Sequence, residues 1–359
     1  MPEKSADQLM GRIVESVRGT FDIFTIFLGD QLGYYRELAG AGPLTSQELA
    51  ARTSTHERYA REWLEQQTVN GLLEVDGPSL PVSQRKFSLP AEYAEVLADS
   101  SSANFMAPLA QLLVGVVGPI EPLLAAMKSG SGVAYADYNR HMKEGQALIN
   151  RPTFLGDLVT TWVPAMPDVF ERLQSDRPAR VAEIGCGAGW AAIGLAQQFP
   201  NLTVDAFDLD PASINMANSN IADQGLSDRV RVHLRDAAES GMDGQYDLVC
   251  AFECIHDLSR PVDVLSAMRR LAGSDGAVLV VDERVEDAFN GVGNDVEWMM
   301  YGWSVLHCLP ATMAEQPSAA TGTVMRAPVL RQYAQKAGFR DVEVLPVDNY
   351  FFRLYRLWQ

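Results

Sequence analysis

The sequence Val181-Ala182-Glu183-Ile184-Gly185-Cys186-Gly187-Ala188-Gly189-Trp190 decides how the chain is interpreted. The mostly apolar run at residues 179–184 predicts a buried parallel strand, and three glycines at alternate positions follow it. The small residues at 191–196 are typical of the first turns of a helix. In a strand–turn–helix unit, backbone N–H groups and the helix dipole can face a polar ligand. Glycines are needed because side chains would keep the ligand away from the backbone.

Strand and helix patterns alternate on the C-terminal side of this turn. Strands are predicted at residues 202–207, 229–234, 246–252 and 277–281, and helices at 211–222, 261–271 and 327–337. A final hairpin, at 342–347 and 351–357, implies one antiparallel strand. The sequence therefore predicts an α/β fold with a Rossmann-like doubly wound sheet over residues 179–359, with an insertion at 284–326.

The N-terminal part, residues 1–100, has a different pattern. A helix over 6–39, two short helices and a predicted hairpin at 71–75 and 85–89 give the outline of a winged helix. The apolar stripe of the first helix is broader than one contact face needs, which favours burial against a second subunit. The candidate recognition helix at 57–67 mixes acidic and basic residues and would partly repel phosphates. We therefore expect this domain to form a homodimer.

Composition limits the partners of the chain. The 359 residues include 47% hydrophobic and 21% charged residues, as in a globular enzyme of two or more domains, and the net charge of −17 argues against a nucleic-acid partner. The longest apolar stretch, residues 105–124, is interrupted by proline and glycine, which favours a buried, broken helix over a membrane span. The polar N-terminus lacks the layout of a signal peptide and the four cysteines lie in or beside apolar segments. Together these features predict a cytoplasmic protein without a membrane partner.

The glycine spacing separates two classes of cofactor. A nicotinamide-binding turn would have G-x-G-x-x-G, but Trp190 occupies the position of the third glycine. Here Glu183 precedes Gly185, Gly187 and Gly189 instead. This pattern resembles the class I S-adenosylmethionine (SAM) methyltransferases, in which an acidic residue at the strand end precedes three glycines. SAM has no phosphates, so an acidic neighbour is tolerated.

Further cofactor contacts are expected where the next strands end. Asp208 ends the second strand, where a carboxylate can accept two hydrogen bonds from a ribose diol, whereas Asp210 is interpreted as a helix cap. The resemblance implies that the position after the third strand contacts the adenine, and Leu209 could cover one adenine face. Phe252, at the end of the fourth strand, borders the same crevice. The predicted cofactor-binding residues are Glu183, Gly185, Gly187, Gly189, Asp208, Leu209, Asp236, Ala237 and Phe252.

A candidate base follows the fourth strand. Methyl transfer depends on alignment of acceptor, carbon and sulfur, and an oxygen acceptor must also lose a proton. His256-Asp257 resembles the His-Asp-Trp segment of small-molecule O-methyltransferases, with Leu258 in place of the tryptophan. The resemblance implies that His256 is the general base and that Asp282 or Glu283, after the fifth strand, orients it. Counting from Gly276 favours Asp282, and the alternative is that His256 caps a loop.

A metal site is not predicted. Glu253 and His256 have the spacing of a di-iron ligand pair, but one copy exists and it lies at a strand end. Cys250 and Cys254 share a strand face without the second pair that zinc needs.

The acceptor side is predicted from aromatic and methionine-rich segments. The insertion at 284–326 and the helical segment at 101–178 are expected to line an acceptor cleft. Arg151 or Arg326 could pair with an acceptor carboxylate or belong to a structural ion pair. The predicted acceptor residues are Tyr138, His141, Arg151, Trp162, Trp298, Met299, Tyr301 and Trp303.

Across nearly its whole length the layout resembles actinobacterial winged-helix class I methyltransferases, which are similar in plan to the plant-type O-methyltransferases. The resemblance implies a SAM-dependent enzyme that methylates a small molecule, most simply on oxygen, and releases S-adenosylhomocysteine (SAH). Three alternatives stay open: N- or C-methylation, a DNA-binding regulator that responds to SAM, and a SAM-binding protein without methyl transfer.

Overall fold

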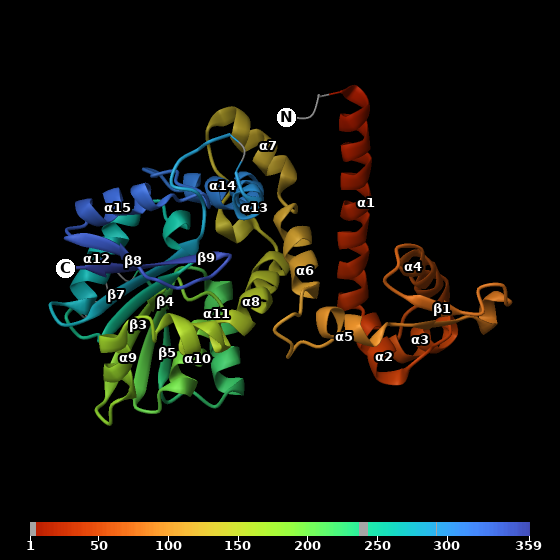
Figure 1. Ribbon diagram of the computed structural model, residues 1–359, viewed down its shortest axis with the longest axis horizontal. Coiled ribbons are helices and arrows are strands. Elements are labelled where there is room, and N and C mark those ends of the chain that lie inside the picture. Colours follow the sequence, from red (N-terminus) through yellow and green to blue (C-terminus); the bar gives the residue numbers. More distant parts are fainter. Residues whose placement is uncertain (1–4, 237–242, 292) are drawn as a thin grey trace. The chain divides into compact units, whose positions relative to one another are not determined.

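The computed structural model describes residues 5–236, 243–291 and 293–359. The chain divides into two compact units (Figure 1). Unit 1 contains Met1–Gly115 and Glu144–Ile149, and unit 2 contains Val116–Lys143 and Asn150–Gln359. The segment at 101–178, predicted as a helical linker, is thus divided between the two units.

Unit 1 has the helices and the hairpin of a winged helix. Its elements are α1 (Ala6–Gln31), α2 (Tyr34–Ala41), α3 (Ser46–Thr53), α4 (Glu57–Val69), β1 (Glu74–Asp76), η1 (Val82–Gln84), β2 (Lys86–Ser88), α5 (Ala91–Leu97) and most of α6 (Ala107–Val116). β1 and β2 pair antiparallel, and Leu44 extends this sheet through a bridge to Phe87. The single helix predicted over 6–39 is two helices, because Gly33 adopts a φ of 74° between them. A φ in that region favours glycine and interrupts the helix.

Aromatic packing around Trp63 holds unit 1 together. The Trp63 ring lies edge-on to Tyr34 and Tyr35, with ring centroids 4.8 and 5.1 Å away, and its Nε1 donates to the Thr25 carbonyl of α1 at 2.8 Å. The tryptophan approaches α1 closely at Gly29: a Cβ there would lie 2.3 Å from Trp63 Cζ2. Glycine at this position therefore permits the close packing of α1 on α4.

Unit 2 is built on a seven-stranded sheet. Its strands are β3 (Ala179–Ile184), β4 (Leu202–Asp208), β5 (Val230–Leu234), β6 (Leu248–Phe252), β7 (Ala277–Glu283), β8 (Asp341–Val344) and β9 (Phe352–Trp358). The strand order is β5-β4-β3-β6-β7-β9-β8; β9 pairs antiparallel with β7 and with β8, and the other pairs are parallel. The predicted doubly wound sheet with one antiparallel strand is confirmed.

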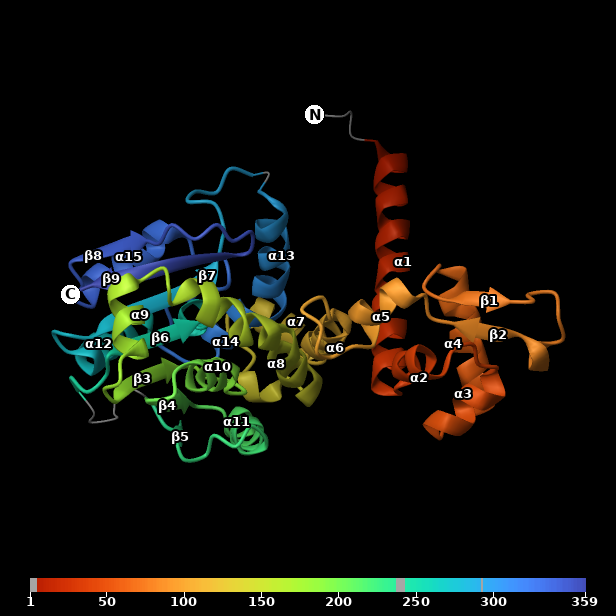
Figure 2. The same ribbon diagram turned by 60° about the horizontal axis from the view of Figure 1, so that its bottom comes forward.

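Helices cover both faces of this sheet (Figure 2). The remaining elements of unit 2 are α7 (Ile120–Ser129), η2 (Tyr135–Asp137), parts of α8 (Arg140–Leu155), η3 (Leu158–Trp162), α9 (Pro167–Gln174), α10 (Trp190–Gln198), α11 (Pro211–Asp223), η5 (Ile255–Asp257), α12 (Pro261–Ala272), α13 (Asp295–Trp303), η6 (Ser304–Cys308), α14 (Leu309–Met313) and α15 (Ala327–Lys336). α10 and α11 pack on β4 and β5, whereas α12 and α15 pack together beside β6, β7 and β8. Right-handed crossovers that leave β3 and β6 in opposite directions along the sheet place these two groups on opposite faces.

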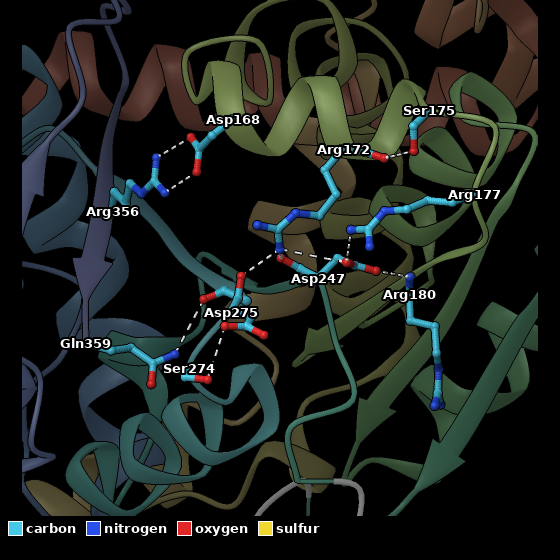
Figure 3. Close-up of polar contacts among 11 residues, drawn as sticks. Asp168, Arg172, Ser175, Arg177, Arg180, Asp247, Ser274, Asp275, Arg356 and Gln359 are labelled. Carbon is cyan, nitrogen blue, oxygen red and sulfur yellow. Dashed lines mark hydrogen bonds and ion pairs between the residues drawn. The ribbon is translucent and has the colours of Figure 1, made fainter.

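Ion pairs and a backbone contact join α9 to β9, and join the residues that follow α9 to Asp247 (Figure 3). Arg356 of β9 binds the Asp168 carboxylate through two bonds of 2.6 Å. Asp247, just before β6, accepts from Arg177 at 2.8 Å and from the backbone N–H of Arg180 at 2.9 Å. Bidentate arginine–carboxylate geometry is among the stronger polar contacts available to a protein.

The apolar stretch at 105–124 contains a break, as predicted, between α6 and α7. Within the described ranges, no one helix has both the length and the apolar character to cross a membrane, although the bent pair α6–α7 has them jointly.

Substitution of Gly29 should distinguish the contribution of close packing to stability from the contribution of helix propensity within α1. Gly29→Ala places a methyl group against Trp63 and Tyr35 and should lower the free energy of unfolding by about 1–3 kcal/mol. The control Gly19→Ala, in the same helix with nothing within 4 Å of the added Cβ, should raise it by about 0.5–1 kcal/mol. Urea unfolding of both variants measures the difference; equal stability of the two would contradict the close packing at Trp63.

Candidate active site

The glycine turn between β3 and α10 has the backbone that the sequence predicted. Gly185, Gly187 and Gly189 adopt φ values of 71°, 52° and 78°, which side-chain-bearing residues rarely adopt. A Cβ on Gly185 would lie 2.9 Å from Cys254, whereas a Cβ on Gly187 would meet nothing within 4 Å. The turn therefore presents bare backbone to open space beside Gly187.

Asp208 fixes this turn to the end of β4. Its Oδ2 accepts from the backbone N–H of Gly187 at 2.8 Å, and its Oδ1 accepts from that of Asp210 at 2.9 Å. Burial raises the pKa of the Asp208 carboxyl, while these backbone hydrogen bonds oppose the rise. Asp210 caps α11 by accepting from Ser213, and it also binds Lys143 at 3.0 Å. The prediction that Asp210 is a helix cap is confirmed.

Glu183 lies under the turn, at the end of β3. Its side chain is buried, and its carboxyl group accepts a hydrogen bond from the backbone N–H of Ala192 in α10. Burial raises its pKa to about 8. Its Oε2 has no hydrogen-bond partner among the described residues. A buried carboxyl oxygen of this kind can receive an ammonium group of a ligand.

The other predicted cofactor residues differ in exposure. Leu209 is 61% exposed beside Asp208, while Phe252 is buried against Phe154 and Trp162. Asp236 lies 4.0 Å from Arg260. Ala237 lies outside the described residues.

His256 is buried in η5, directly after β6. Its Nδ1 lies 2.7 Å from Asp282 Oδ1 at the end of β7, within hydrogen-bonding distance. The parallel pairing of β6 and β7 explains this contact, because Phe252 and Val281 are register partners and both strands end at the same edge of the sheet. The structure thus brings His256 and Asp282 together and places Glu283 Oε2 3.5 Å from the same nitrogen.

Burial and the neighbouring charges shift the pKa values of His256, Asp282 and Glu283. Burial alone lowers the pKa of His256, but Asp282, Asp257 and Glu283 raise it well above the usual range for histidine. Burial alone would raise the pKa of Asp282, but the charge and hydrogen bond of His256 bring it below its usual range. Burial, opposed by His256 and reinforced by Asp282, raises the pKa of Glu283. The charged forms of His256 and Asp282 therefore favour each other, whereas the charged form of Glu283 is disfavoured.

The pKa of a second histidine, His307 in η6, is shifted in the opposite direction from that of His256. Burial lowers its pKa to about 4, so its ring is neutral near pH 7. The ring lies edge-on to Tyr138 and Tyr135, with centroids 4.5 and 5.7 Å away, and Tyr138 donates its hydroxyl proton to the Leu306 carbonyl. Both tyrosines belong to unit 2, so this aromatic group is part of the same unit as His256.

The predicted acceptor residues do not form one group. Tyr138 and Trp162 are buried, Tyr301 bonds to Arg326, and Trp303 packs beside Val285, Val296 and Met300. Arg151 lies over the Trp190 ring at 4.5 Å, Trp298 is 70% exposed, Met299 is 38% exposed, and the His141 backbone N–H bonds to Asn139 at the start of α8. Arg326 binds Glu297, which matches the alternative of a structural ion pair.

Three further side chains lie near His256 that the sequence did not predict to belong to its group. Asp257 Oδ1 lies 3.3 Å from His256 Nε2, and Glu253, held by Asn150 at 2.7 Å, follows β6 with a φ of 50°. His307 lies far along the chain. Asp257 and Glu253 stood in the segment that identified His256, and a carboxylate count there could have found them.

The cysteines of unit 2 are thiols. Burial raises the pKa of Cys186, Cys250 and Cys254, and raises that of Cys308 to about 12. Cys254 contacts the glycine turn through its Sγ, which bonds to the Ile184 carbonyl at 3.3 Å.

Two clusters of residues that include His256 have the ligand types and spacing to bind a metal ion. The ligand atoms of His256, Asp282 and Glu283, and those of His256, Asp257 and Cys308, lie within 4.8 Å of one another. In the first cluster, the hydrogen bond between His256 and Asp282 explains why these residues lie close together, so no ion is needed to explain it.

Comparison with known protein families identifies both domains. Residues 182–278 match the methyltransferase domain, and residues 23–99 match the Rv2258c-like winged HTH domain. Among curated proteins, the chain is 32% identical over 114 residues to polyketide synthase ThaQ of Burkholderia thailandensis, covering 32% of the chain and 6% of that protein. It is 30% identical over 118 residues to a probable tocopherol O-methyltransferase of Oryza sativa subsp. japonica, covering 33% of the chain and 31% of that protein. The chain thus spans less than a third of the length of either relative.

Solved structures resemble the chain over nearly its full length. The mitomycin 7-O-methyltransferase MmcR has a TM-score of 0.70 at 19% identity and covers 98% of both chains. PigF with SAH has a TM-score of 0.71 at 16% identity, covering 100% of both. Human N-acetylserotonin methyltransferase in complex with SAM has a TM-score of 0.67 at 16% identity, covering 100% of this chain and 99% of that one. At these identities the similarity establishes a shared fold.

The sheet order, the glycine turn and the carboxylate at the end of β4 define a Rossmann-like methyltransferase fold. With the two family matches, the chain consists of an N-terminal winged-helix domain joined to a methyltransferase domain.

Proposed function

We propose that the protein is a SAM-dependent methyltransferase that methylates a small molecule on oxygen. The observation that carries the proposal is the glycine turn: three glycines at positive φ, with open space beside Gly187 and a carboxylate, Asp208, at the same strand edge. The match to a methyltransferase domain and the SAM and SAH complexes of proteins that share the fold support it.

The residues of unit 2 fit the parts of SAM. Glu183 offers its buried Oε2 to the ammonium group, and the oxygens of Asp208, each with a further lone pair, can accept from a ribose diol. Leu209 would cover one face of the adenine, and Asp236 would accept a hydrogen bond from its amino group. When bound, SAM supplies an electrophilic methyl group and leaves as SAH.

His256 is the proposed general base. A hydroxyl of the acceptor donates its proton to Nε2, and the hydrogen bond from Nδ1 to Asp282 holds the ring and stabilises the imidazolium that forms. Asp282 therefore acts through His256 as a positioning residue. Because His256 must be neutral before it accepts a proton, its raised pKa shifts the active form to higher pH.

The winged helix is proposed to form a homodimer and not to bind DNA. In α4, Arg58 pairs with Glu62, and Arg61 lies 3.6 Å from Glu57, so these arginines are engaged by carboxylates. α1, about 39 Å long from its 26 residues, carries apolar side chains that are 40–61% exposed. These are Leu9, Met10, Ile13, Val14, Val17, Phe21, Phe24 and Leu28. A stripe of this length is large enough to be an interface, and a second copy of α1 matches it in length and character.

Two substitutions should separate cofactor binding from catalysis. Asp208→Ala should abolish SAM binding in calorimetry, because it removes both ribose acceptors and the anchor of Gly187. His256→Ala should keep the SAM affinity but slow transfer of labelled methyl groups from SAM to a metabolite extract by roughly 10²–10⁴-fold. Unchanged SAM affinity in Asp208→Ala would refute the ribose assignment, and a full rate in His256→Ala would refute the base.

The pKa of His256 should fall when Asp282 is neutralised. In the folded protein the carboxylate raises that pKa, so NMR titration should find His256 protonated well above pH 6.5, and Asp282→Asn should lower its midpoint by one pH unit or more. The rising limb of the methylation rate should move to lower pH with it. His256→Gln assigns the resonance among five histidines, and the exposed Asp263→Asn is the control. A midpoint that Asp282→Asn leaves in place would contradict the pairing.

Charges placed on the exposed face of α1 should give a monomer. The double variant Ile13→Glu, Phe21→Glu should change the mass measured by light scattering from that of a dimer to that of a monomer, without a change in helix content. Arg12→Glu, on the opposite side of the helix, should leave the dimer intact. A dimer that persists in the double variant would place the interface elsewhere.

A further inference from the structure

A cavity with three arginines in its lining lies in unit 2. Its volume is about 360 Å³, which is within the range of pockets that hold small ligands, roughly 300–1,000 Å³. Its walls come from β8, β9, α15 and the segments that follow β7 and β8. None of the described residues that line it is among those assigned above to the cofactor, to the His256 group or to the acceptor. The proposed methyl transfer therefore does not use this cavity.

The three arginines reach the cavity from three different elements. Arg284 follows β7, Arg331 belongs to α15 and Arg353 belongs to β9. The backbone N–H of Arg284 donates to the Phe351 carbonyl at 2.7 Å, which continues the pairing of β7 with β9 and brings Arg284 to the start of β9. Arg331 lies one helical turn after Ala327, which also lines the cavity, so both occupy the same face of α15. The fold thus assembles three guanidinium groups around one cavity.

Arg353 and Arg331 differ in how far the protein engages them. Arg353 donates to Asp287 at 2.8 Å and also bonds to the Tyr355 hydroxyl. Asp287 lines the cavity too, but its side chain is 64% exposed, so its charge is well solvated. Arg331 is exposed and has no hydrogen bond or ion pair with any residue that the structure describes. Arg331 therefore keeps all its donors for a ligand.

Arg284 is held loosely. Its Nη1 donates to the Asn349 carbonyl at 2.8 Å and lies 3.8 Å from an oxygen of Asp348. The Asp348 side chain is fully exposed, and exposed ion pairs contribute little to stability. An anion in the cavity can therefore compete with Asp348 for Arg284. The lining brings three positive charges and one negative charge together in a chain whose net charge is −17.

The number of guanidinium groups favours one kind of anion. A carboxylate has two oxygens, and a single guanidinium fork satisfies both of them. A dianionic phosphoryl group has three terminal oxygens and two charges, so it can use more than one guanidinium group. Leu345, Val347 and Leu354 also line the cavity and can contact an apolar part of the ligand. The lining therefore suits a phosphate monoester with a small apolar body.

We propose that this cavity binds the dianionic phosphoryl group of a small molecule, with Arg331 and Arg284 donating to its oxygens and Arg353 adding positive charge. Most of the surface of so acidic a chain repels such an anion, so binding depends on these three side chains. The site consists of other residues than the methyl-transfer site, and the proposal does not rest on the proposed function.

Phenyl phosphate, inorganic phosphate and benzoate are the probes that test the ligand class. Calorimetry uses the full chain at a pH above 7, where a phosphate monoester is a dianion, and with SAH present, because the helix that follows the glycine turn can itself attract phosphate. Phenyl phosphate should bind about tenfold more tightly than benzoate, with inorganic phosphate between them. Inorganic phosphate that equals phenyl phosphate would assign the site to the free ion. Benzoate as tight as phenyl phosphate, or no saturable binding of either phosphate, overturns the proposal.

Variants of the arginines locate the bound anion. Arg331→Gln and Arg284→Gln should each weaken phenyl phosphate about tenfold. Lys336→Gln is the control: it removes the same charge from an exposed position in the same helix, outside the cavity lining, and should leave the affinity unchanged. Circular dichroism should find all three variants folded as the parent chain is. Equal affinity in Arg331→Gln and Lys336→Gln overturns the proposal. The variants locate the anion whether or not SAH binds, so this proposal and the proposed function fail independently.

Discussion

The bond between the Asp208 carboxylate and the Gly187 backbone N–H connects the two strands on which the cofactor side depends. β3 ends in the glycine turn and β4 ends in Asp208, and one carboxyl group spans them while a second oxygen fixes the start of α11 through Asp210. The glycines make the bond possible, because only a chain at positive φ can direct this amide toward the neighbouring strand. The same constraint leaves bare backbone on the other side of the turn, where a ligand can approach.

The proposed catalytic residues, His256 and Asp282, depend on the register in which β6 pairs with β7. Parallel pairing brings the residues after both strands to one edge, so His256 and Asp282 meet although 26 residues separate them in sequence. Burial of several carboxyl groups around one imidazole is costly unless they are neutralised or paired. Pairing of Asp282 with His256 offsets part of this cost, and the raised pKa of Glu283 disfavours a further charge there.

Features set by local chemistry could be predicted from the sequence, and those set by distant packing could not. The glycine turn, the Asp210 cap and the antiparallel strand each follow from residue types at short spacing, and all were predicted. The break at Gly33 was missed because apolar residues continue on both sides of it and the periodicity hides one glycine. The environment of His307 was not predicted for another reason: its lowered pKa and its contact with Tyr138 come from burial beside a segment 169 residues earlier in the chain. Exposure likewise depends on tertiary packing, which is why Trp162 and Trp298, similar in sequence context, end up buried and exposed.

Burial makes two cysteines beside the glycine turn poor nucleophiles. Cys186 lies within the turn and Cys254 lies against it. A thiolate there would be a stronger nucleophile than a hydroxyl and would accept the methyl group itself. Because burial keeps both groups as thiols, the protein can hold an alkylating agent beside sulfur without inactivating itself.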